Sequence, residues 1–148
     1  MNDTNAIEIL LVEDNQDDLD MTLRALRQAN LANRIQVARD GEEAVEFIFC
    51  QGAHAGRNFD MGPKLVLLDL KLPKIDGIEV LARIKGDSRT KTIPVVMLTS
   101  SMEQQDVIKS YNLGVNSYIV KPVIFEGFVS AVQELGMYWL LLNQAPGH

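Results

Sequence analysis

One cysteine and two histidines are present in the 148 residues, and this scarcity excludes several kinds of site. Cys50 cannot form an internal disulfide, which suits the reducing environment of the cytoplasm. His54 and His148 offer neither a metal-binding pair nor a catalytic dyad. Disulfide scaffolds and histidine-based metal centres are therefore not expected.

Long hydrophobic runs and clustered positive charge are also lacking. The apolar stretch 137–142 is far too short to cross a bilayer, and the first five residues lack the basic start of a secretory signal. The formal net charge is −6 and no basic stripe is present, which argues against a nucleic-acid surface. We predict a cytoplasmic protein whose partners include neither nucleic acid nor a membrane.

What the chain does contain is typical of one globular domain. Hydrophobic residues make up 47% and charged residues 23%, and 148 residues are enough to bury a core. We predict a single domain over residues 1–148, with its core at about 7–142 and no output domain attached.

Apolar runs alternate with amphipathic segments five times along the chain. The runs predict buried parallel strands at 7–12, 35–38, 65–68, 95–98 and 117–120. The amphipathic segments predict helices from about 14 to 31, at 42–49, at 78–85, at 103–112 and from about 124 to 142. Residues 51–63 read as a long loop, and Gly114 is expected to end the fourth helix. This alternation predicts an α/β fold with a doubly wound, five-stranded parallel sheet.

Polar residues follow four of the five strands directly. Glu13 and Asp14 follow the first, Asp69 the third, Thr99 the fourth and Lys121 the fifth. The carboxyl ends of parallel strands meet at the edge where open α/β sheets place their sites. Three carboxylates, a hydroxyl and an ammonium group at one edge would suit a divalent cation and a phosphoryl group, because the cation neutralises the phosphoryl oxygens.

Four segments around these residues resemble the receiver domain of two-component response regulators. They are Val12-Glu13-Asp14-Asn15, residues 67–77 (LLDLKLPKIDG), Met97-Leu98-Thr99-Ser100 and Tyr118-Ile119-Val120-Lys121-Pro122. The resemblance covers roughly residues 7–142 and implies the flavodoxin-like (βα)5 receiver fold. Within the family, the single-domain regulators that partner bacterial phytochromes are similar in their long loop before the third strand and in an aromatic end like Tyr138-Trp139-Leu140.

The resemblance implies a role for each site residue. Asp69 would accept a phosphoryl group from a histidine kinase, while Mg²⁺ or Mn²⁺ would be held by Glu13, Asp14, Asp69 and the backbone carbonyl of Lys71. Lys121 and Thr99 would contact the phosphoryl oxygens. Tyr118 occupies the aromatic switch position of the family. Together with Thr99, it would change conformation when Asp69 is phosphorylated.

The implied function is that of a stand-alone receiver that signals through protein contacts and dephosphorylates itself slowly, without being an enzyme. Lys71 and Ser101 stand at positions that tune this hydrolysis in the family. The kinase would be a histidine kinase, and a bacteriophytochrome is one candidate.

Two other functions fit the same architecture. A flavodoxin-like FMN module would need a Ser/Thr/Gly-rich phosphate loop after the first strand, where this chain has four acidic residues. An aspartate-dependent phosphohydrolase would usually carry a second Asp two residues after its nucleophile, where this chain has Lys71. A degenerate receiver that acts only as a scaffold is disfavoured by the intact acidic, hydroxyl and lysine positions.

The last predicted helix carries more apolar surface than one buried face requires. Val132, Leu135 and Trp139 would pack on the sheet, which leaves Met137, Tyr138 and Leu141 on other faces. Excess apolar surface of this kind usually marks an interface. We therefore expect a homodimer through the face formed by the helix 103–112, the strand 117–120 and the last helix, unless the chain end folds back over these residues.

Overall fold

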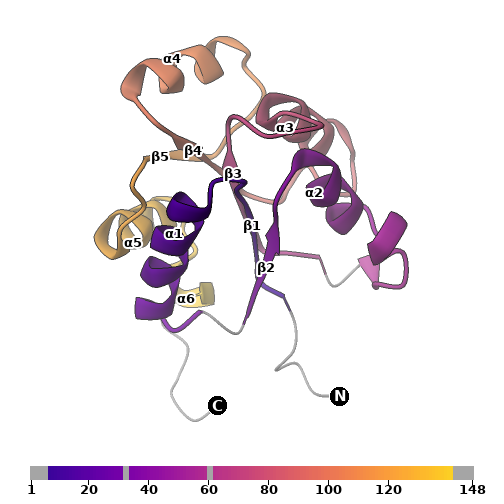
Figure 1. Ribbon diagram of the computed structural model, residues 1–148, viewed down its shortest axis with the longest axis horizontal. Coiled ribbons are helices and arrows are strands. Elements are labelled where there is room, and N and C mark those ends of the chain that lie inside the picture. Colours follow the sequence, from indigo (N-terminus) through magenta and orange to yellow (C-terminus); the bar gives the residue numbers. More distant parts are fainter. Residues whose placement is uncertain (1–6, 32–33, 60–61, 142–148) are drawn as a thin grey trace.

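Five parallel strands form one sheet in the computed structural model, which describes residues 7–31, 34–59 and 62–141 (Figure 1). The strand order β2-β1-β3-β4-β5 confirms the predicted doubly wound arrangement, and the chain changes direction across the sheet between β1 and β3. The strands are β1 (Ile9–Val12), β2 (Ile35–Ala38), β3 (Leu65–Asp69), β4 (Val95–Thr99) and β5 (Ser117–Val120). Such a switch point is where open α/β sheets bind ligands.

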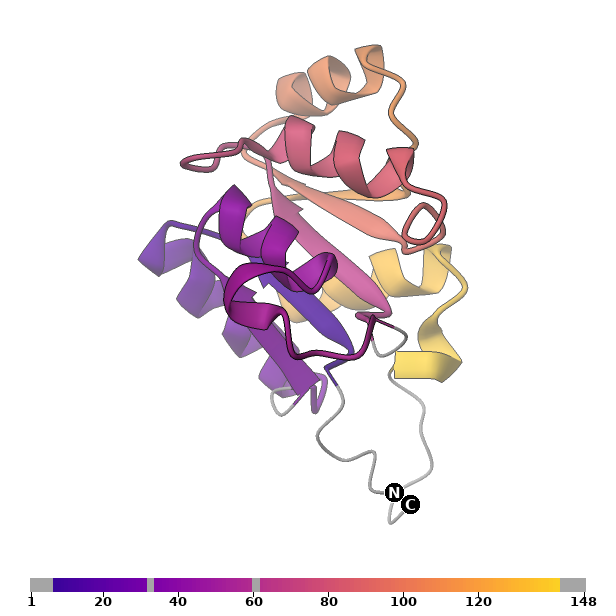
Figure 2. The ribbon, with the colours of Figure 1, turned by 90° about the vertical axis from the view of Figure 1, so that its right-hand side faces the viewer.

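Helices cover both faces of this sheet (Figures 1 and 2). The helices are α1 (Gln16–Gln28), α2 (Gly41–Ile48), η3 (Gly52–His54), α3 (Gly77–Gly86), α4 (Met102–Ser110), α5 (Phe125–Glu134) and α6 (Tyr138–Leu141). Side chains of α1, α5 and α6 join the apolar cluster on one face, and those of α2, α3 and α4 join the cluster on the other. Because β1 and β3 are buried on both faces, all of their residues are apolar except Asp69 at the end of β3.

Two strands extend one residue further than the sequence predicted, and this matters for the site. Asp69 is the last residue of β3 and pairs with Leu98, while Thr99 is the last residue of β4 and pairs with Val120. The ladder continues through these polar residues because their backbones still find partners on the neighbouring strand. Asp69 and Thr99 are thus fixed by sheet pairing.

Side-chain caps set where the helices begin. Asn15 accepts a hydrogen bond from the N–H of Asp18, which starts α1 at Gln16 instead of Asp14. Ser101 caps α4 in the same way through the N–H of Gln104. The fourth helix ends at Ser110, earlier than predicted, because Asn112, just after the C-cap residue Tyr111, adopts a φ of 52°; Gly114 lies beyond it.

The prediction of one continuous last helix is wrong. Gly136 adopts a φ of 72°, and the N–H of Met137 donates to the carbonyl of Val132 at 3.0 Å, which ends α5 and redirects the chain into the short α6. Met137 and Leu141 then return to the apolar cluster under α1 and α5, where both are buried. The exposed apolar surface expected from these two residues is therefore absent. Leu142 and the side chain of Trp139 lie outside what the structure describes.

The predicted loop before β3 contains one short turn of 3-10 helix, η3, and its residues 60–61 are not described. Across the described ranges, no helix combines the length and apolar character needed to cross a bilayer.

Candidate functional site

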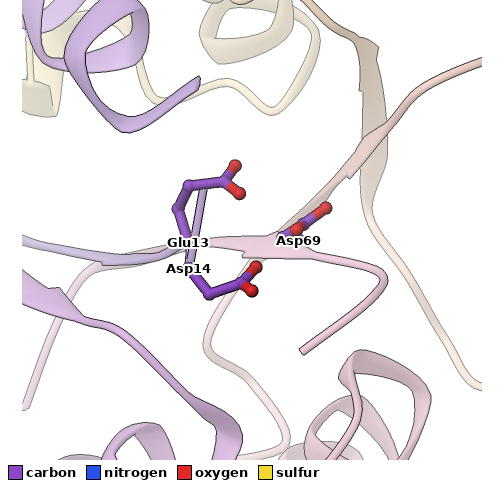
Figure 3. Close-up of side chains that lie close together, drawn as sticks. All are labelled: Glu13, Asp14 and Asp69. Atoms are coloured by element: carbon purple, nitrogen blue, oxygen red, sulfur yellow. The ribbon is translucent and has the colours of Figure 1, made fainter. Parts of the chain in front are cut away.

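The polar residues predicted to converge do so at the carboxyl ends of β1, β3, β4 and β5. Figure 3 shows the side chains of Glu13, Asp14 and Asp69 close together at this edge of the sheet. Each offers an oxygen atom, and these oxygens lie within 4.8 Å of one another. Glu13 and Asp69 are buried, whereas Asp14 is exposed. Clustered hard oxygen ligands of this kind fit Mg²⁺ or Mn²⁺, which neutralise the repulsion among the carboxylates.

Lys121 supplies the positive charge of the site. Its Nζ lies 3.0 Å from a carboxylate oxygen of Glu13, 3.0 Å from one of Asp69 and 3.0 Å from one of Asp18. The backbone N–H of Lys121 donates to the carbonyl of Thr99 at 2.6 Å, which ties the residue to the end of β4. Burial lowers the pKa of Lys121, but the carboxylates of Asp69, Glu13 and Asp18 more than offset this and raise it. The ammonium group is therefore held in its charged form.

Glu13 is the most perturbed acid of the site. Burial, and then the negative charge of Asp69, raise its pKa to about 7, although Lys121 opposes the rise. Its other oxygen, Oε2, accepts a hydrogen bond from the N–H of Asn15 at 3.3 Å. At neutral pH Glu13 is thus poised between its neutral and its charged form, and a bound cation would favour the charged one.

Thr99 and Tyr118 lie on the neighbouring strands β4 and β5. The Thr99 side chain is fully buried, and its hydroxyl has no hydrogen-bond partner among the described residues. Tyr118 is half-buried and pairs with Met97 on β4. The Nζ of Lys109, on α4, lies 5.4 Å from the centre of the Tyr118 ring, so that α4 and β5 are joined by a cation–π contact.

The loop after Asp69 is shaped by a glycine. A Cβ at Gly77 would collide with the backbone carbonyl of Asp69, so only glycine lets α3 begin this close to the site. The N–H of Gly77 donates to the carbonyl of Leu70 at 2.9 Å. Lys71 lies exposed in this loop and lines an open hollow of about 310 Å³ together with Leu72.

Three contributors to the site escaped sequence reasoning. Asp18 was interpreted only as a favourable charge in the first turn of a helix, yet it binds Lys121. Arg39 donates to the backbone carbonyls of Glu13 and Asp14 and braces the β1–α1 turn. Gln104 accepts the N–H of Ser100 at 2.7 Å.

The comparison with protein-family models gives a match to the response regulator receiver domain over residues 9–133. The chain belongs to this family. Response regulator Rcp1 from Synechocystis sp. is 41% identical over 132 residues, which are 89% of this chain and 88% of Rcp1. Receivers are phosphoacceptors in two-component signalling, so this chain is a signalling protein rather than an enzyme.

Solved structures of other receivers agree with this assignment. The bacteriophytochrome response regulator RtBRR has a TM-score of 0.86 at 48% identity, over 95% of this receiver and 84% of RtBRR. The Mn²⁺-bound form of Rcp1 has a TM-score of 0.71 at 37% identity, over 94% and 96% of the two chains. The phosphorylated cyanobacterial phytochrome response regulator RcpA has a TM-score of 0.72 at 38% identity, over 95% and 99%. The predicted similarity to phytochrome-associated regulators is confirmed.

Proposed function

We propose that this receiver accepts a phosphoryl group on Asp69 from a histidine kinase and signals through protein–protein contacts. The observation that carries the proposal is the position of Lys121, whose Nζ lies 3.0 Å from the Asp69 carboxylate beside the Glu13 and Asp14 carboxylates. A carboxylate that must attack a negatively charged phosphorus needs positive charge next to it, and this arrangement supplies it.

In the transfer, a carboxylate oxygen of Asp69 attacks the phosphorus of a phosphohistidine, and the bond between phosphorus and the histidine nitrogen breaks. Glu13, Asp14, Asp69 and the backbone carbonyl of Lys71 would hold Mg²⁺ or Mn²⁺, which neutralises charge on the phosphoryl oxygens when bound. Lys121 pairs with one phosphoryl oxygen as a compact charge, and the Thr99 hydroxyl donates a hydrogen bond to another. The unpartnered hydroxyl of Thr99 supports this role, because it is buried and free to donate.

The conformational response would pass from Thr99 to Tyr118 and then to α4. Thr99 ends β4, Tyr118 lies on the adjacent strand, and Lys109 of α4 contacts the Tyr118 ring. Only one α4 side chain, that of Ile108, is buried among those described, so little apolar packing would have to break if α4 shifts. The conformational change is therefore expected at α4.

The kinase that fits best is a bacteriophytochrome. The names of RtBRR and RcpA, both similar to this receiver over nearly all of its length, associate them with phytochromes. The stand-alone role is supported by the same comparisons, since this receiver covers 88% of Rcp1 and 99% of RcpA. We also propose slow self-dephosphorylation, tuned by Lys71 and Ser101.

We also propose a homodimer through the α4–β5–α5 face. The residues that support it are not Met137, Tyr138 and Leu141, on which the sequence-based expectation rested. Five large apolar side chains are at least one third exposed on α4, on β5 or in the turns that follow them: Met102, Val107, Tyr111, Val120 and Ile124. A surface of this kind on one side of a small domain usually marks an interface.

The FMN and phosphohydrolase alternatives find no support in the site. Glu13 and Asp14, next to Asp17 and Asp18, would repel the phosphate of FMN at the end of β1. Lys71 occupies the position two residues after Asp69, where a phosphohydrolase would usually have its acidic residue.

The experiment that tests the proposed function is labelling with acetyl phosphate in Mg²⁺ buffer, followed by intact-mass spectrometry. Wild type should gain one phosphoryl group, and Asp69→Asn should gain none, because an amide is not a nucleophile. EDTA should block labelling of wild type. Asp76→Asn, which alters an exposed carboxylate in the loop after β3, is the matched control and should be labelled. Normal labelling of the Asp69→Asn protein would refute the proposal.

A further inference from the structure

Asp18 binds the site lysine from outside the group of carboxylates that can hold a cation. Its Oδ2 accepts a hydrogen bond from Lys121 Nζ at 3.0 Å, although Asp18 lies on α1 and Lys121 follows β5. The cation-binding group consists of Glu13, Asp14 and Asp69 and does not include Asp18. Within the described residues, the ion pair of the Asp18 carboxylate is the one with Lys121.

The position of Asp18 is fixed by the start of α1. Asn15 caps the helix by accepting the N–H of Asp18 at 2.9 Å, which holds the backbone of Asp18 in the first helical turn. The Asp18 side chain is about one third exposed, whereas that of Lys121 is 14% exposed. A rigid and partly solvated carboxylate therefore faces a largely buried ammonium group.

Lys121 and a divalent cation would compete for the same oxygens. Two of the three carboxylates that bind Lys121, those of Glu13 and Asp69, are also members of the cation-binding group. The Lys121 ammonium group lies 3.0 Å from one oxygen of each of these three carboxylates. When a cation takes Glu13 and Asp69, only Asp18 remains to balance the charge of Lys121, and a largely buried charge without a partner is strongly unfavourable.

We propose that Asp18 is a positioning residue that keeps Lys121 at the site while a cation and a phosphoryl group occupy Glu13 and Asp69. This inference rests on the proposed function, since the phosphoryl group on Asp69 is the group that Lys121 must reach. Asp18 holds Nζ next to the phosphoryl oxygens and removes the need for Lys121 to compete with the cation. Its role is to orient another side chain, and it touches neither phosphorus nor metal.

The test compares Asp18→Asn with Asp17→Asn. Both variants lose one negative charge in the same helical turn, but Asp17 is exposed and is outside the Lys121 ion pairs. The first readout is the ¹⁵N NMR signal of the Lys121 ammonium group, observed in EDTA and in saturating Mg²⁺. The second is the rate of phosphorylation by acetyl phosphate at saturating Mg²⁺. Asp18→Glu serves as the conservative variant.

We expect wild type and Asp17→Asn to keep the Lys121 signal in both buffers. Asp18→Asn should keep it in EDTA, where Glu13 and Asp69 still bind Lys121, and lose it in Mg²⁺. Its phosphorylation rate should fall roughly tenfold or more, as expected when a hydrogen bond between charged groups is lost. Asp18→Glu should restore much of the rate.

Two results would overturn the role of Asp18. One is an Asp18→Asn protein that matches Asp17→Asn in both the Lys121 signal and the rate. The other is loss of the signal already in EDTA, which would mean that Asp18 only maintains the local fold. If wild type were not phosphorylated at all, the proposed function would fail, while the Lys121 signal in Mg²⁺ would still decide the role of Asp18.

Discussion

At the scale of single residues, the Lys121 ammonium group connects the end of β5 to three other elements. Lys121 follows β5 and contacts Glu13 after β1, Asp69 at the end of β3 and Asp18 in α1. Burial alone would lower the pKa of this lysine, so its charge is kept by the carboxylates around it. Glu13 is the most buried of these carboxylates, and burial, followed by the negative charge of Asp69, raises its pKa.

Glu13 makes the stability of the cation-free protein depend on pH. Its pKa is about 7 in the folded protein and 4.5 as the ordinary value, so between these pH values the folded state binds more protons than the unfolded state. The contribution of Glu13 to stability is therefore full below about pH 4.5, falls as pH rises to 7 and is then constant. The loss corresponds to roughly 3 kcal/mol at most.

Glu13→Gln should remove this pH dependence, because its amide does not ionise. In EDTA at pH 8 the variant should melt a few degrees above wild type, and the difference between the two should shrink toward pH 5. Added Mg²⁺ should raise the melting temperature of wild type more than that of the variant. Thermal unfolding followed by circular dichroism measures both effects, with Glu103→Gln on the exposed face of α4 as control. A difference that grows toward pH 5 would contradict the raised pKa.

Thr99 should be needed for the response but not for phosphorylation itself. A hydrogen bond from its hydroxyl to a charged phosphoryl oxygen is worth roughly 1.5–3 kcal/mol. Moving a two-state element from 1:99 to 99:1 takes about 5.5 kcal/mol, so Lys121 or a partner must supply the rest. Thr99→Ala should accept phosphate and show smaller NMR shifts in α4 and at Tyr118. Spectra of phosphorylated variant and wild type that coincide would rule out this coupling.

Sequence reasoning reached most of the site because parallel strands bring their carboxyl ends together. Asp69, Thr99 and Lys121 could be placed at one edge from strand order alone. Asp18 could not, because its contact with Lys121 depends on the distance between the first turn of α1 and the end of β5. That distance is set by sheet twist and helix packing, which a linear pattern does not encode.

At the scale of elements, the last helix shows where periodicity misleads. Residues 124–142 carry apolar side chains at helical spacing on both sides of Gly136, so the pattern alone predicts one helix. The left-handed conformation of Gly136 turns the chain and lets Met137 and Leu141 reach the core. Apolar side chains at helical spacing fit one continuous helix and also two helices separated by a turn. Gly136 is the only local feature of the sequence that indicates the turn.

Gly136→Ala should therefore destabilise the protein by about 1 kcal/mol. The new Cβ would meet open space, so the cost comes from the backbone φ of 72° and not from a collision. Gly86→Ala is the matched control, since Gly86 also has open space around it, lies at the end of α3 and has no positive φ. The control should be neutral or slightly stabilising. The urea concentration at the midpoint of unfolding measures the effect. Equal midpoints for Gly136→Ala and Gly86→Ala would show that α6 does not depend on the left-handed turn at Gly136.

At the scale of the whole molecule, the exposed apolar side chains are unevenly distributed. Met21 on α1 is the one large exposed apolar residue of the described chain that does not belong to α4, β5 or the turns that follow them. The β2 and β5 ends of the sheet therefore differ in their exposed apolar side chains. The β5 end is the one suited to bind a second copy of the chain.

Tyr111→Glu should weaken the proposed dimer, because it places a charge among these apolar side chains. Tyr111 is 56% exposed, so the substitution leaves the core intact. Ala53→Glu introduces the same charge at an exposed position of η3, which packs on α2, and should leave association unchanged. Sedimentation equilibrium at tens of micromolar, with and without phosphorylation, measures the effect. A wild type that is monomeric in both states rules out the dimer.

The most direct measurement for the whole account is the chemical position of the phosphoryl group. Protein phosphorylated by acetyl phosphate in Mg²⁺ buffer is reduced with borohydride, which converts a phosphorylated aspartate into homoserine, and its peptides are then sequenced by mass spectrometry. We expect homoserine at position 69 alone, since only that carboxylate combines contact with Lys121 and membership of the cation-binding group with a place at the end of β3. Homoserine at position 14 or 18, or stoichiometric labelling with none at position 69, would contradict the account.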